Sequence, residues 1–380
     1  MEVKLVKKEL EDFVDLVSKF VSRNTTLPVL ENIYIKAGEG ILTLRGTDMS
    51  KYIQVSFPAN IESEGVVTVN ARTLGEFLKT IEDEQILLES DENDQFLKIR
   101  SSGDEISIKG IPASEYVAVP EIVPQKSVQI PASYFVEWVK KVEFAVSDRS
   151  LTAVLTWILI RFKNIDGKGK LIFAWTDALR LADYRIDMDW WEEFGVIVPK
   201  VNVVDITKAV EFGIEKEVEN IQLDITDSFV GVKLDLPENK EIYISSVLIE
   251  GSFPDYENEN IMPTKFNTLV KVSPQGLEKA IKKVVILTKW LNYFVDIKTN
   301  VDEMIISSWE TDMWEVNTRL KAIVDGQKVE FGVNGKQVLD FLKEVKGDVI
   351  DINIVDAERP LIFKDPLIPN YTYIVRPLIK

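Results

Sequence analysis

Two sequence landmarks recur three times along the chain at the same spacing, and this repetition constrains the fold more than any other feature. The first is a Thr-Asp pair after a strand-like apolar run, at Thr47-Asp48, Thr176-Asp177 and Thr311-Asp312. The second is an apolar strand that leads into a helix, centred on Val69, Val198 and Val333. Both landmarks advance by 129 and then by 135 residues. Because two unrelated landmarks share both steps, the chain is predicted to contain three copies of one unit.

Each unit is predicted to contain two helices packed on antiparallel strands. The expected helices cover residues 7–22, 71–82, 131–146, 199–212, 273–289 and 334–346. In the fifth helix, Leu277, Ala280 and Ile281 recur at three- and four-residue spacing, which indicates one buried face. Alternating segments such as Phe96–Arg100 and Ile350–Ile354 indicate half-buried strands. The predicted fold class is therefore α+β, with tandem domains that carry two helices on antiparallel sheets.

Two proline-containing segments, residues 117–127 and 256–268, are the predicted linkers between the units. They divide the chain into expected domains of residues 1–122, 123–262 and 263–380. A length of 380 residues agrees with two or three domains rather than one.

The composition excludes several classes of chemistry. The chain has no cysteine, which excludes disulfides, thiolate nucleophiles and cysteine-ligated metal centres. It also has no histidine, so a Ser-His-Asp triad and imidazole metal ligands are excluded. The longest apolar run, residues 151–160, is about half of what a membrane-spanning helix needs, and the amino terminus lacks the pattern of a secretory signal. The protein is expected to be cytoplasmic, with no membrane association and no cofactor.

Positive charge is concentrated on the predicted helices, although the chain as a whole is acidic. The net charge of −17 argues against simple attraction to DNA, but the six predicted helices together carry +3 while the remaining residues carry −20. Lys279, Lys282 and Lys283 share one face of the fifth helix at i, i+3 and i+4. A solvated helix surface is the alternative interpretation, but recurrence in all three units favours a surface that contacts phosphates. The candidate DNA contacts are Arg23, Arg72, Lys79, Lys140, Lys141, Lys208, Lys279, Lys282, Lys283, Lys336 and Lys343.

Five motifs spread over the whole chain resemble those of bacterial sliding clamps, the β subunits of the replicative DNA polymerase. They are Thr-Leu-Pro-Val-Leu-Glu-Asn-Ile at 26–33, Leu-Arg-Gly-Thr-Asp at 44–48, Thr-Asp-Ala-Leu-Arg-Leu at 176–181, Gly-Ser-Phe-Pro-Asp-Tyr at 251–256 and Tyr-Ile-Val-Arg-Pro-Leu at 373–378. The resemblance implies a non-catalytic processivity factor with three clamp-type domains per chain. It also implies a head-to-tail homodimer that forms a closed ring around double-stranded DNA.

The implied ring accounts for the charge distribution. Twelve helices, each about 10 Å across and standing side by side, would leave a bore of about 28 Å. Duplex DNA could pass through this bore without being gripped, so contacts to phosphates can be weak and independent of sequence. An acidic exterior would repel DNA, while a mildly basic bore would allow the ring to slide.

The resemblance further implies a hydrophobic cleft between the second and third domains. Such a cleft captures short peptide motifs of the polymerase, the clamp loader and repair proteins. By position, it would be formed by Leu155, Thr176, Ala178, Leu181, Pro254, Ile261, Met262, Ile374 and Leu378. Ala178 and Leu179 replace the glycine and histidine usual in the family, and Arg376 stands where an apolar residue is typical, so an altered peptide preference is expected.

For ring closure, the resemblance points to Ile106 of the first domain meeting Ile286 and Leu287 of the third domain of another copy. A heterologous contact that closes after two copies gives a ring rather than a filament. Packing within a domain is the alternative for these apolar residues, as ordinary core packing is for those of the cleft.

Two other classes of function fit parts of the sequence. A carboxylate-based, metal-dependent enzyme is one, with candidate residues Asp48, Asp177, Asp312, Asp187 and Asp189. With 62 acidic residues such groupings are expected by chance, and a Thr-Asp pair at a strand end commonly stabilises a turn. A β-rich module that binds carbohydrate or protein is the other, suggested by Trp190, Trp191 and Trp314. It leaves the helix lysines unexplained.

Overall fold

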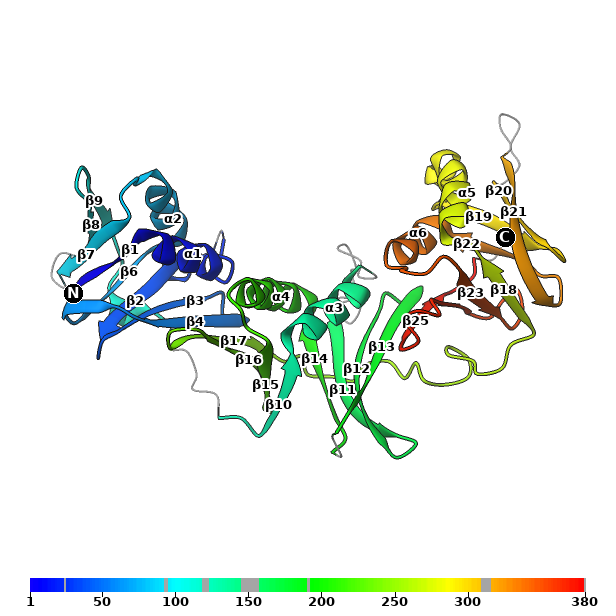
Figure 1. Cartoon of the computed structure of the whole chain (residues 1–380), viewed down its shortest axis with the longest axis horizontal. Coiled ribbons are helices and arrows are strands. Elements are labelled where there is room, and N and C mark those ends of the chain that lie inside the picture. The colour runs from blue at the N-terminus through cyan, green and yellow to red at the C-terminus, as the bar shows by residue number, and fades with distance from the viewer. Residues whose placement is uncertain are drawn as a thin grey trace. The chain divides into compact units, whose positions relative to one another are not determined.

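The computed structural model of the chain describes residues 1–23, 25–91, 95–117, 123–144, 157–189, 192–308 and 316–378. Six α-helices and 25 β-strands lie within these residues (Figure 1). The chain divides into two compact units, of which unit 1 contains Met1–Glu137 and Val201–Ile249, and unit 2 contains Trp138–Lys200 and Glu250–Lys380. No helix within the described residues is long and apolar enough to cross a membrane.

The order of elements repeats three times, which confirms the predicted α+β repeat. The first copy contains β1 (Glu2–Val6), α1 (Lys7–Val17), β2 (Asn32–Gly38), β3 (Ile41–Thr47), β4 (Lys51–Pro58), β5 (Asn60–Ser63), β6 (Gly65–Asn70), α2 (Ala71–Thr80), β7 (Gln85–Asp91), β8 (Phe96–Arg100) and β9 (Glu105–Lys109). The second contains β10 (Lys126–Pro131), α3 (Ala132–Glu143), β11 (Trp157–Ile165), β12 (Lys168–Thr176), β13 (Arg180–Met188), β14 (Phe194–Pro199), α4 (Lys200–Glu215), β15 (Asn220–Ile225), β16 (Phe229–Leu236) and β17 (Lys240–Val247). The third contains β18 (Thr268–Val272), α5 (Pro274–Leu287), β19 (Phe294–Thr299), β20 (Glu303–Ser307), β21 (Asn317–Gly326), β22 (Glu330–Asn334), α6 (Gly335–Lys343), β23 (Ile350–Ile354), β24 (Leu361–Lys364) and β25 (Tyr371–Val375).

Unit 1 contains two sheets. An eight-stranded sheet has the order β10-β15-β16-β17-β4-β3-β2-β6, and a five-stranded sheet has the order β5-β1-β7-β8-β9. In the larger sheet, β17 of the second domain pairs antiparallel with β4 of the first, so that Ile244 lies opposite Ile53. The two domains are therefore joined by backbone hydrogen bonds as well as by side chains.

Unit 2 repeats this arrangement at the next junction. Its twelve-stranded sheet has the order β14-β11-β12-β13-β25-β24-β23-β18-β21-β20-β19-β22. Within it, β13 of the second domain pairs antiparallel with β25 of the third, and Leu181 lies opposite Ile374. An edge strand of each domain thus continues the sheet of its neighbour.

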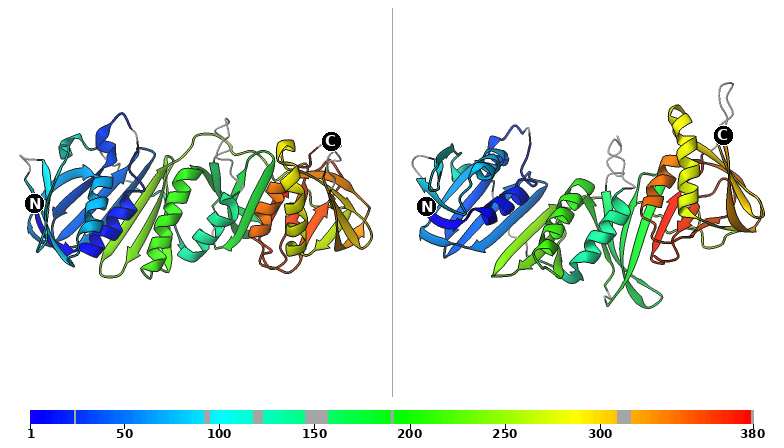
Figure 2. Two further views of the ribbon diagram at one scale, coloured as in Figure 1. Left: turned by 90° about the horizontal axis from the view of Figure 1, so that it is seen from above. Right: turned by 45° about the horizontal axis from the view of Figure 1, so that its top comes forward.

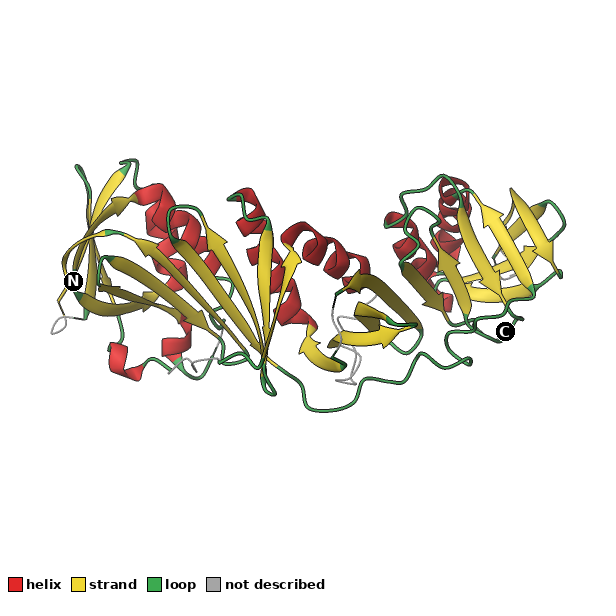
Figure 3. Cartoon of the chain, turned by 60° about the horizontal axis from the view of Figure 1, so that its bottom comes forward, coloured by secondary structure: helices red, strands yellow, loops and turns green. Residues whose placement is uncertain are grey.

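Each pair of helices packs on the strands through an apolar stripe. Leu277, Ala280, Ile281 and Val284 of α5 are all buried, as the predicted periodicity requires. Figure 2 shows α5 beside α6 and α1 beside α2, and Figure 3 shows the helices packed against the strands. Side-chain oxygens cap the starts of α2, α5 and α6, as where Asn334 accepts hydrogen bonds from the first amides of α6. Helices α1 and α2 therefore form one layer in the first domain, and α5 and α6 form one layer in the third.

Two helices differ in length from the expected ranges. Helix α1 ends at Val17 instead of reaching residue 22, and the Ser18 hydroxyl donates a hydrogen bond to the carbonyl of Val14 at this end. Helix α4 continues to Glu215, beyond the expected end at residue 212. The other four helices lie within the predicted ranges.

Candidate functional site

The Thr-Asp landmarks form tight turns between consecutive strands. Thr47 Oγ1 donates to the carbonyl of Lys51 at 2.9 Å, and Asp48 Oδ1 accepts from the Lys51 amide at 3.0 Å. Thr176 and Asp177 repeat these two bonds in the second domain, at 2.8 and 2.9 Å. The third pair lies outside the described residues. The carboxylates of the first two pairs thus bind backbone amides, which is the turn-stabilising role favoured over catalysis.

The other candidates for carboxylate chemistry are also placed in the structure. Asp187 forms an ion pair with Lys170, and this hydrogen bond lowers the pKa of the Asp187 carboxyl below its ordinary value. In the part of the chain that the structure describes, no three acidic side chains gather closely enough to hold a metal ion. The tryptophans at 190, 191 and 314 lie outside that part.

Ten of the eleven predicted DNA contacts have exposed side chains. They come from the helices of all three domains, except Arg23, which follows α1. Several of them form ion pairs with neighbouring carboxylates: Arg72 with Glu76, Lys79 with Asp15, Lys208 with Asp205, Lys282 with Glu278 and Lys343 with Asp340. The cation of each pair is exposed even where the carboxylate is mostly buried, and ion pairs with an exposed cation contribute little to stability, so the cations can exchange these partners for phosphates.

The prediction for Lys141 is wrong. Lys141 lies in the second domain and is only 4% exposed. Its ammonium group forms an ion pair with the Glu344 carboxylate at 3.1 Å and donates a hydrogen bond to the Glu344 carbonyl. The neighbouring Lys140 is exposed. The helical face of Lys141 is therefore covered by the third domain and cannot contact DNA.

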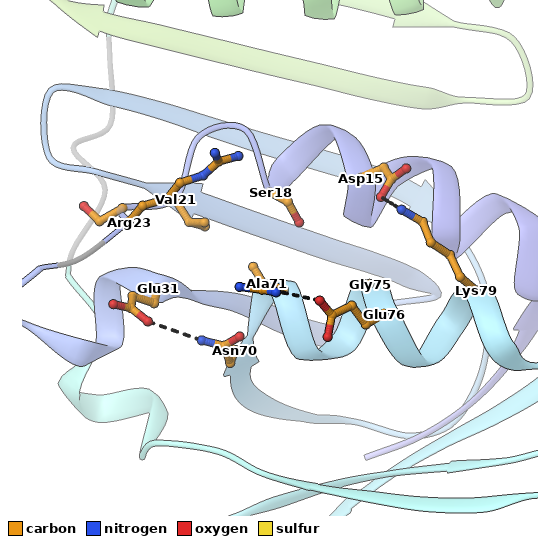
Figure 4. A pocket seen from close by; sticks show the side chains of 12 residues that line it. Asp15, Ser18, Val21, Arg23, Glu31, Asn70, Ala71, Gly75, Glu76 and Lys79 are labelled. Carbon is orange, nitrogen blue, oxygen red and sulfur yellow. Dashed lines mark hydrogen bonds and ion pairs between the residues drawn. The ribbon is translucent and has the colours of Figure 1, made fainter.

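Three predicted DNA contacts lie around one polar pocket between α1 and α2 (Figure 4). This pocket has a volume of about 580 Å³, and its charged lining residues are Arg23, Arg72, Lys79, Asp15, Glu31 and Glu76. In Figure 4, Lys79 points from α2 toward Asp15 on α1, with 3.0 Å between their charged atoms. Because three cations face three carboxylates, the pocket has no excess of positive charge.

Three of the predicted cleft residues lie side by side on adjacent strands of unit 2. Thr176 on β12 is opposite Leu181 on β13, which in turn is opposite Ile374 on β25. All three are buried, with Leu181 and Ile374 each 3% exposed. They form a continuous row of buried side chains across the paired strands that join the second and third domains.

Other cleft residues lie at the ends of these strands. Ala178 is exposed in the turn between β12 and β13, next to Leu179, which is 43% exposed. The amide of Arg376 donates to the Leu179 carbonyl at 2.8 Å, and the amide of Leu378 donates to the Gly332 carbonyl at 2.8 Å. The turn and the carboxyl-terminal segment are thus joined, and they leave the Leu179 side chain accessible. Leu155 lies outside the described residues.

The segment that links the second and third domains supplies Pro254, Ile261 and Met262. Pro254 is exposed and lines a pocket of about 380 Å³ with residues from β11, β14 and the linker. Ile261 and Met262 are half-buried, and the Met262 sulfur lies 3.7 Å from a guanidinium nitrogen of Arg185. The structure places these three residues in the linker, whereas Thr176, Leu181 and Ile374 belong to paired strands of unit 2.

A charged cluster that the sequence did not predict fixes this linker. The Tyr256 hydroxyl donates to the buried Asp183 carboxylate at 2.7 Å, and Arg185 binds the same carboxylate. Burial raises the pKa values of Tyr256 and Asp183. Glu257 contacts Arg185, Lys163 and Arg161 at 3.0, 2.5 and 3.4 Å. The signal in the sequence was the charged pair Asp183 and Arg185 beside the apolar residues Leu181, Ala182 and Ile186 of the same strand.

The predicted subunit contacts lie on an edge strand of unit 1 and on a helix of unit 2. Ile106 is half-buried on β9, the edge strand of the five-stranded sheet. Ile286 and Leu287 lie in the last turn of α5, where Ile286 is 68% exposed and Leu287 is half-buried. Ile286 therefore does not belong to the core of its own domain.

Three repeats of one α+β domain, joined by strand pairing and carrying basic side chains on their helices, define a three-domain clamp fold. Residues 1–120, 129–255 and 259–378 match the N-terminal, central and C-terminal domains of the DNA polymerase III beta subunit. The Bacillus subtilis beta sliding clamp is 25% identical over 96% of each chain, and that of Rickettsia bellii is 23% identical over 100% of this chain and 99% of the relative. The chain therefore belongs to the DNA polymerase III beta subunit family, the sliding clamps.

Solved structures show the same fold over the whole chain. The DNA polymerase III subunit beta from Pseudomonas aeruginosa has a TM-score of 0.90 at 21% identity, with 100% of both chains covered. The DNA polymerase sliding clamp from Bacillus subtilis has a TM-score of 0.90 at 24% identity, with coverage of 100% of this chain and 99% of that one. The function expected from the sequence, a sliding clamp without catalytic activity, is that of this family.

Proposed function

We propose that two copies of this chain associate head to tail into a closed ring that encloses duplex DNA. The ring tethers the replicative polymerase and other proteins, which dock short peptides into the cleft of unit 2. It catalyses no reaction and is opened by a separate clamp loader. Such a protein works in the cytoplasm, where bacterial DNA is replicated.

The observation that carries this proposal is the strand pairing made twice within the chain. The edge strands β4 and β13 occupy the same position in the first and second domains, and each pairs with the last strand of the next domain, β17 or β25. The remaining last strand is β9, which has β8 on one side and, among the described strands, none on the other. The remaining counterpart is β21, whose first half pairs only with β20 within the described strands. Pairing of β9 with β21 of another copy would repeat the junction a third time.

This third junction is heterologous, because β9 and β21 belong to different domains. A heterologous contact forms a ring when it closes and a filament when it does not. Closure after two copies gives six domains, joined by four contacts within chains and two between chains. Exposed Ile286 on α5 and half-buried Ile106 on β9 provide apolar area at the surfaces that this junction would bring together.

Enclosure explains how an acidic protein stays on DNA. The exposed helix cations of all three domains offer weak contacts that are independent of sequence, while the rest of the chain carries the excess of negative charge. Retention then depends on the topology of the ring, and the affinity for phosphates can remain low enough to permit sliding.

The decisive experiment measures native mass and retention on nicked circular DNA before and after the circle is cut. We expect the mass of two chains, loading onto the circle by a clamp loader, and loss of the protein through the ends after linearisation. Retention that does not change after cutting would contradict enclosure, and a chain that stays monomeric would contradict the ring.

A further inference from the structure

One face of α2 is exposed although the same face of α4 and α6 is covered. The three helices start after residues 70, 199 and 334, so Phe77, Ile206 and Phe341 occupy the same helical position. Ile206 and Phe341 are 2% and 0% exposed, whereas Phe77 is 38% exposed. Three residues further on, Ala209 and Glu344 are buried and half-buried, and Thr80 is exposed. A large apolar side chain on this face of α2 therefore lacks the cover that its equivalents have.

A matching difference occurs on the first helix of each domain. The buried residues Leu10, Phe135 and Leu277 align α1, α3 and α5 with one another. In this alignment, Leu16, Lys141 and Lys283 occupy the same position. Leu16 and Lys141 are 1% and 4% exposed, whereas Lys283 is exposed. The position is covered in the two domains that precede another domain of the chain, and it is open in the last domain.

Lys141 shows what a lysine does at this position. Helix α6 ends at Lys343, and Glu344 is its C-cap residue. The Lys141 ammonium donates to the Glu344 carbonyl and lies 3.1 Å from the Glu344 carboxylate. Carbonyls at the carboxyl end of a helix have no partner within the helix and carry partial negative charge. Lys141 thus caps the second helix of the following domain.

Within the chain, a lysine occupies this position of the first helix only where the second helix of the following domain ends opposite it. At the first junction, α4 runs on to Glu215, and Ala209, the equivalent of Glu344, lies inside the helix. No terminal carbonyl is present there, and the first domain has Leu16 in place of a lysine. Helix α2, in contrast, ends at Thr80, which is the equivalent of Glu344. The third domain supplies Lys283.

We propose that Lys283 caps the carboxyl end of α2 in a second copy of this chain, and this inference rests on the proposed head-to-tail association. Glu82, two residues after Thr80, is exposed and forms no ion pair among the described residues, so it can provide the carboxylate. Ile286, one turn beyond Lys283, and Phe77, one turn before Thr80, are exposed apolar side chains next to the same contact. Lys283 is then a subunit contact and not one of the DNA contacts predicted for α5.

Chemical cross-linking tests the contact directly, because the chain has no cysteine of its own. The variant with Lys283→Cys and Thr80→Cys is treated with a short bis-maleimide and analysed under denaturing conditions. The matched control carries Lys282→Cys with Thr80→Cys. Lys282 is equivalent to Asp15, which pairs with Lys79 of its own domain and so points away from the junction. We expect covalent dimers from the first variant and at most traces from the second.

Dimer dissociation provides the second measurement. Lys283→Met should raise the dissociation constant of the dimer roughly tenfold, because each ring loses two cation–helix contacts. Lys282→Met should leave the dissociation constant unchanged. At protein concentrations below the dissociation constant, where the chains are monomeric, the melting curves of both variants should match that of the wild type. If the wild type dimerises but the variant with Lys283→Cys and Thr80→Cys gives no covalent dimer and Lys283→Met leaves the dissociation constant unchanged, the inference alone is overturned. A wild-type chain that never dimerises overturns the proposed ring.

Discussion

Arg180 and Asp340 form an ion pair, 2.8 Å from Nη1 to Oδ2, that joins the second domain to the third. Their side chains are only 9% and 13% exposed. Arg180 also binds Asp177 at 3.0 Å and donates to the carbonyl of Phe144 at 3.1 Å. Lys51 and Asp205 occupy the equivalent positions at the first junction and form a pair that is also buried. At both junctions within the chain, the strand after the Thr-Asp turn thus begins with a cation, and this cation pairs with an acidic residue on the second helix of the following domain.

Replacing Asp340 by asparagine should weaken the junction of the second and third domains. The change leaves Arg180 largely buried with one fewer anionic partner, and losing one side of such a pair costs about 3 kcal/mol. We expect urea to unfold unit 2 at a lower concentration in Asp340→Asn. The double variant Arg180→Met with Asp340→Leu should recover only part of the loss, because it removes both charges of this pair but leaves Asp177 without the Arg180 guanidinium. Equal stability of Asp340→Asn and the wild type would show that Asp177 alone is sufficient.

Reversing charge on α6 should weaken contact with DNA without affecting the cleft. Lys336 and Lys343 are exposed on one face, seven residues apart. In Lys336→Glu with Lys343→Glu, the slope of the logarithm of the DNA association constant against the logarithm of salt concentration should decrease in magnitude by about two. Each lost phosphate contact contributes about one to this slope. The control is Lys168→Glu with Lys328→Glu, which makes the same change in net charge at exposed lysines outside the helices. An equal effect in both variants would contradict a specific role for the helices.

An acidic substitution at the rim of the proposed cleft should abolish the proposed peptide capture. Leu179 is 43% exposed in the turn beside Ala178, so Leu179→Asp adds charge without disturbing the core. We expect loss of polymerase stimulation with unchanged dimer mass, because an apolar anchor would meet a carboxylate. Leu181 is a poorer test position, since it is buried between Thr176 and Ile374 and a carboxylate there would destabilise the sheet. Normal polymerase stimulation by Leu179→Asp would show that the peptide does not dock beside Leu179.

The sequence predicted the features that depend on neighbouring residues. The apolar spacing of Leu277 and Ile281 marked α5, and the two repeated landmarks predicted three copies of one domain. It could not predict which helix faces the next domain covers, because Arg180 and Asp340 are 160 residues apart and no local pattern joins them. For the same reason Lys141 was expected on an open face like Lys140, although its partner Glu344 lies 203 residues further along the chain.

The turn after Thr176 holds a side chain in an unfavourable conformation. Ala178 has a φ of 69°, in the left-handed region where glycine has no steric penalty. Ala178→Gly should therefore leave the protein as stable as the wild type or more stable by up to about 1 kcal/mol, because relief of strain opposes the greater entropy of the unfolded glycine. Ala182→Gly, in the buried part of β13, should lower stability and provides the matched control. Thermal melting distinguishes the two signs.

Stability of the linker between the second and third domains should fall in acid through Glu257. Burial alone would raise the pKa of Glu257, but the hydrogen bond from Lys163 and the charges of Arg185 and Arg161 outweigh it and leave the pKa below the ordinary 4.5. The folded chain then binds fewer protons than the unfolded chain, so this contribution is fully present above about pH 4.5 and is lost as pH falls through the folded pKa. Glu257→Gln should lower the melting temperature at neutral pH and approach the wild type in acid. A constant difference between the melting temperatures of the two proteins from about pH 3 to about pH 7 would exclude Glu257 as the titrating group.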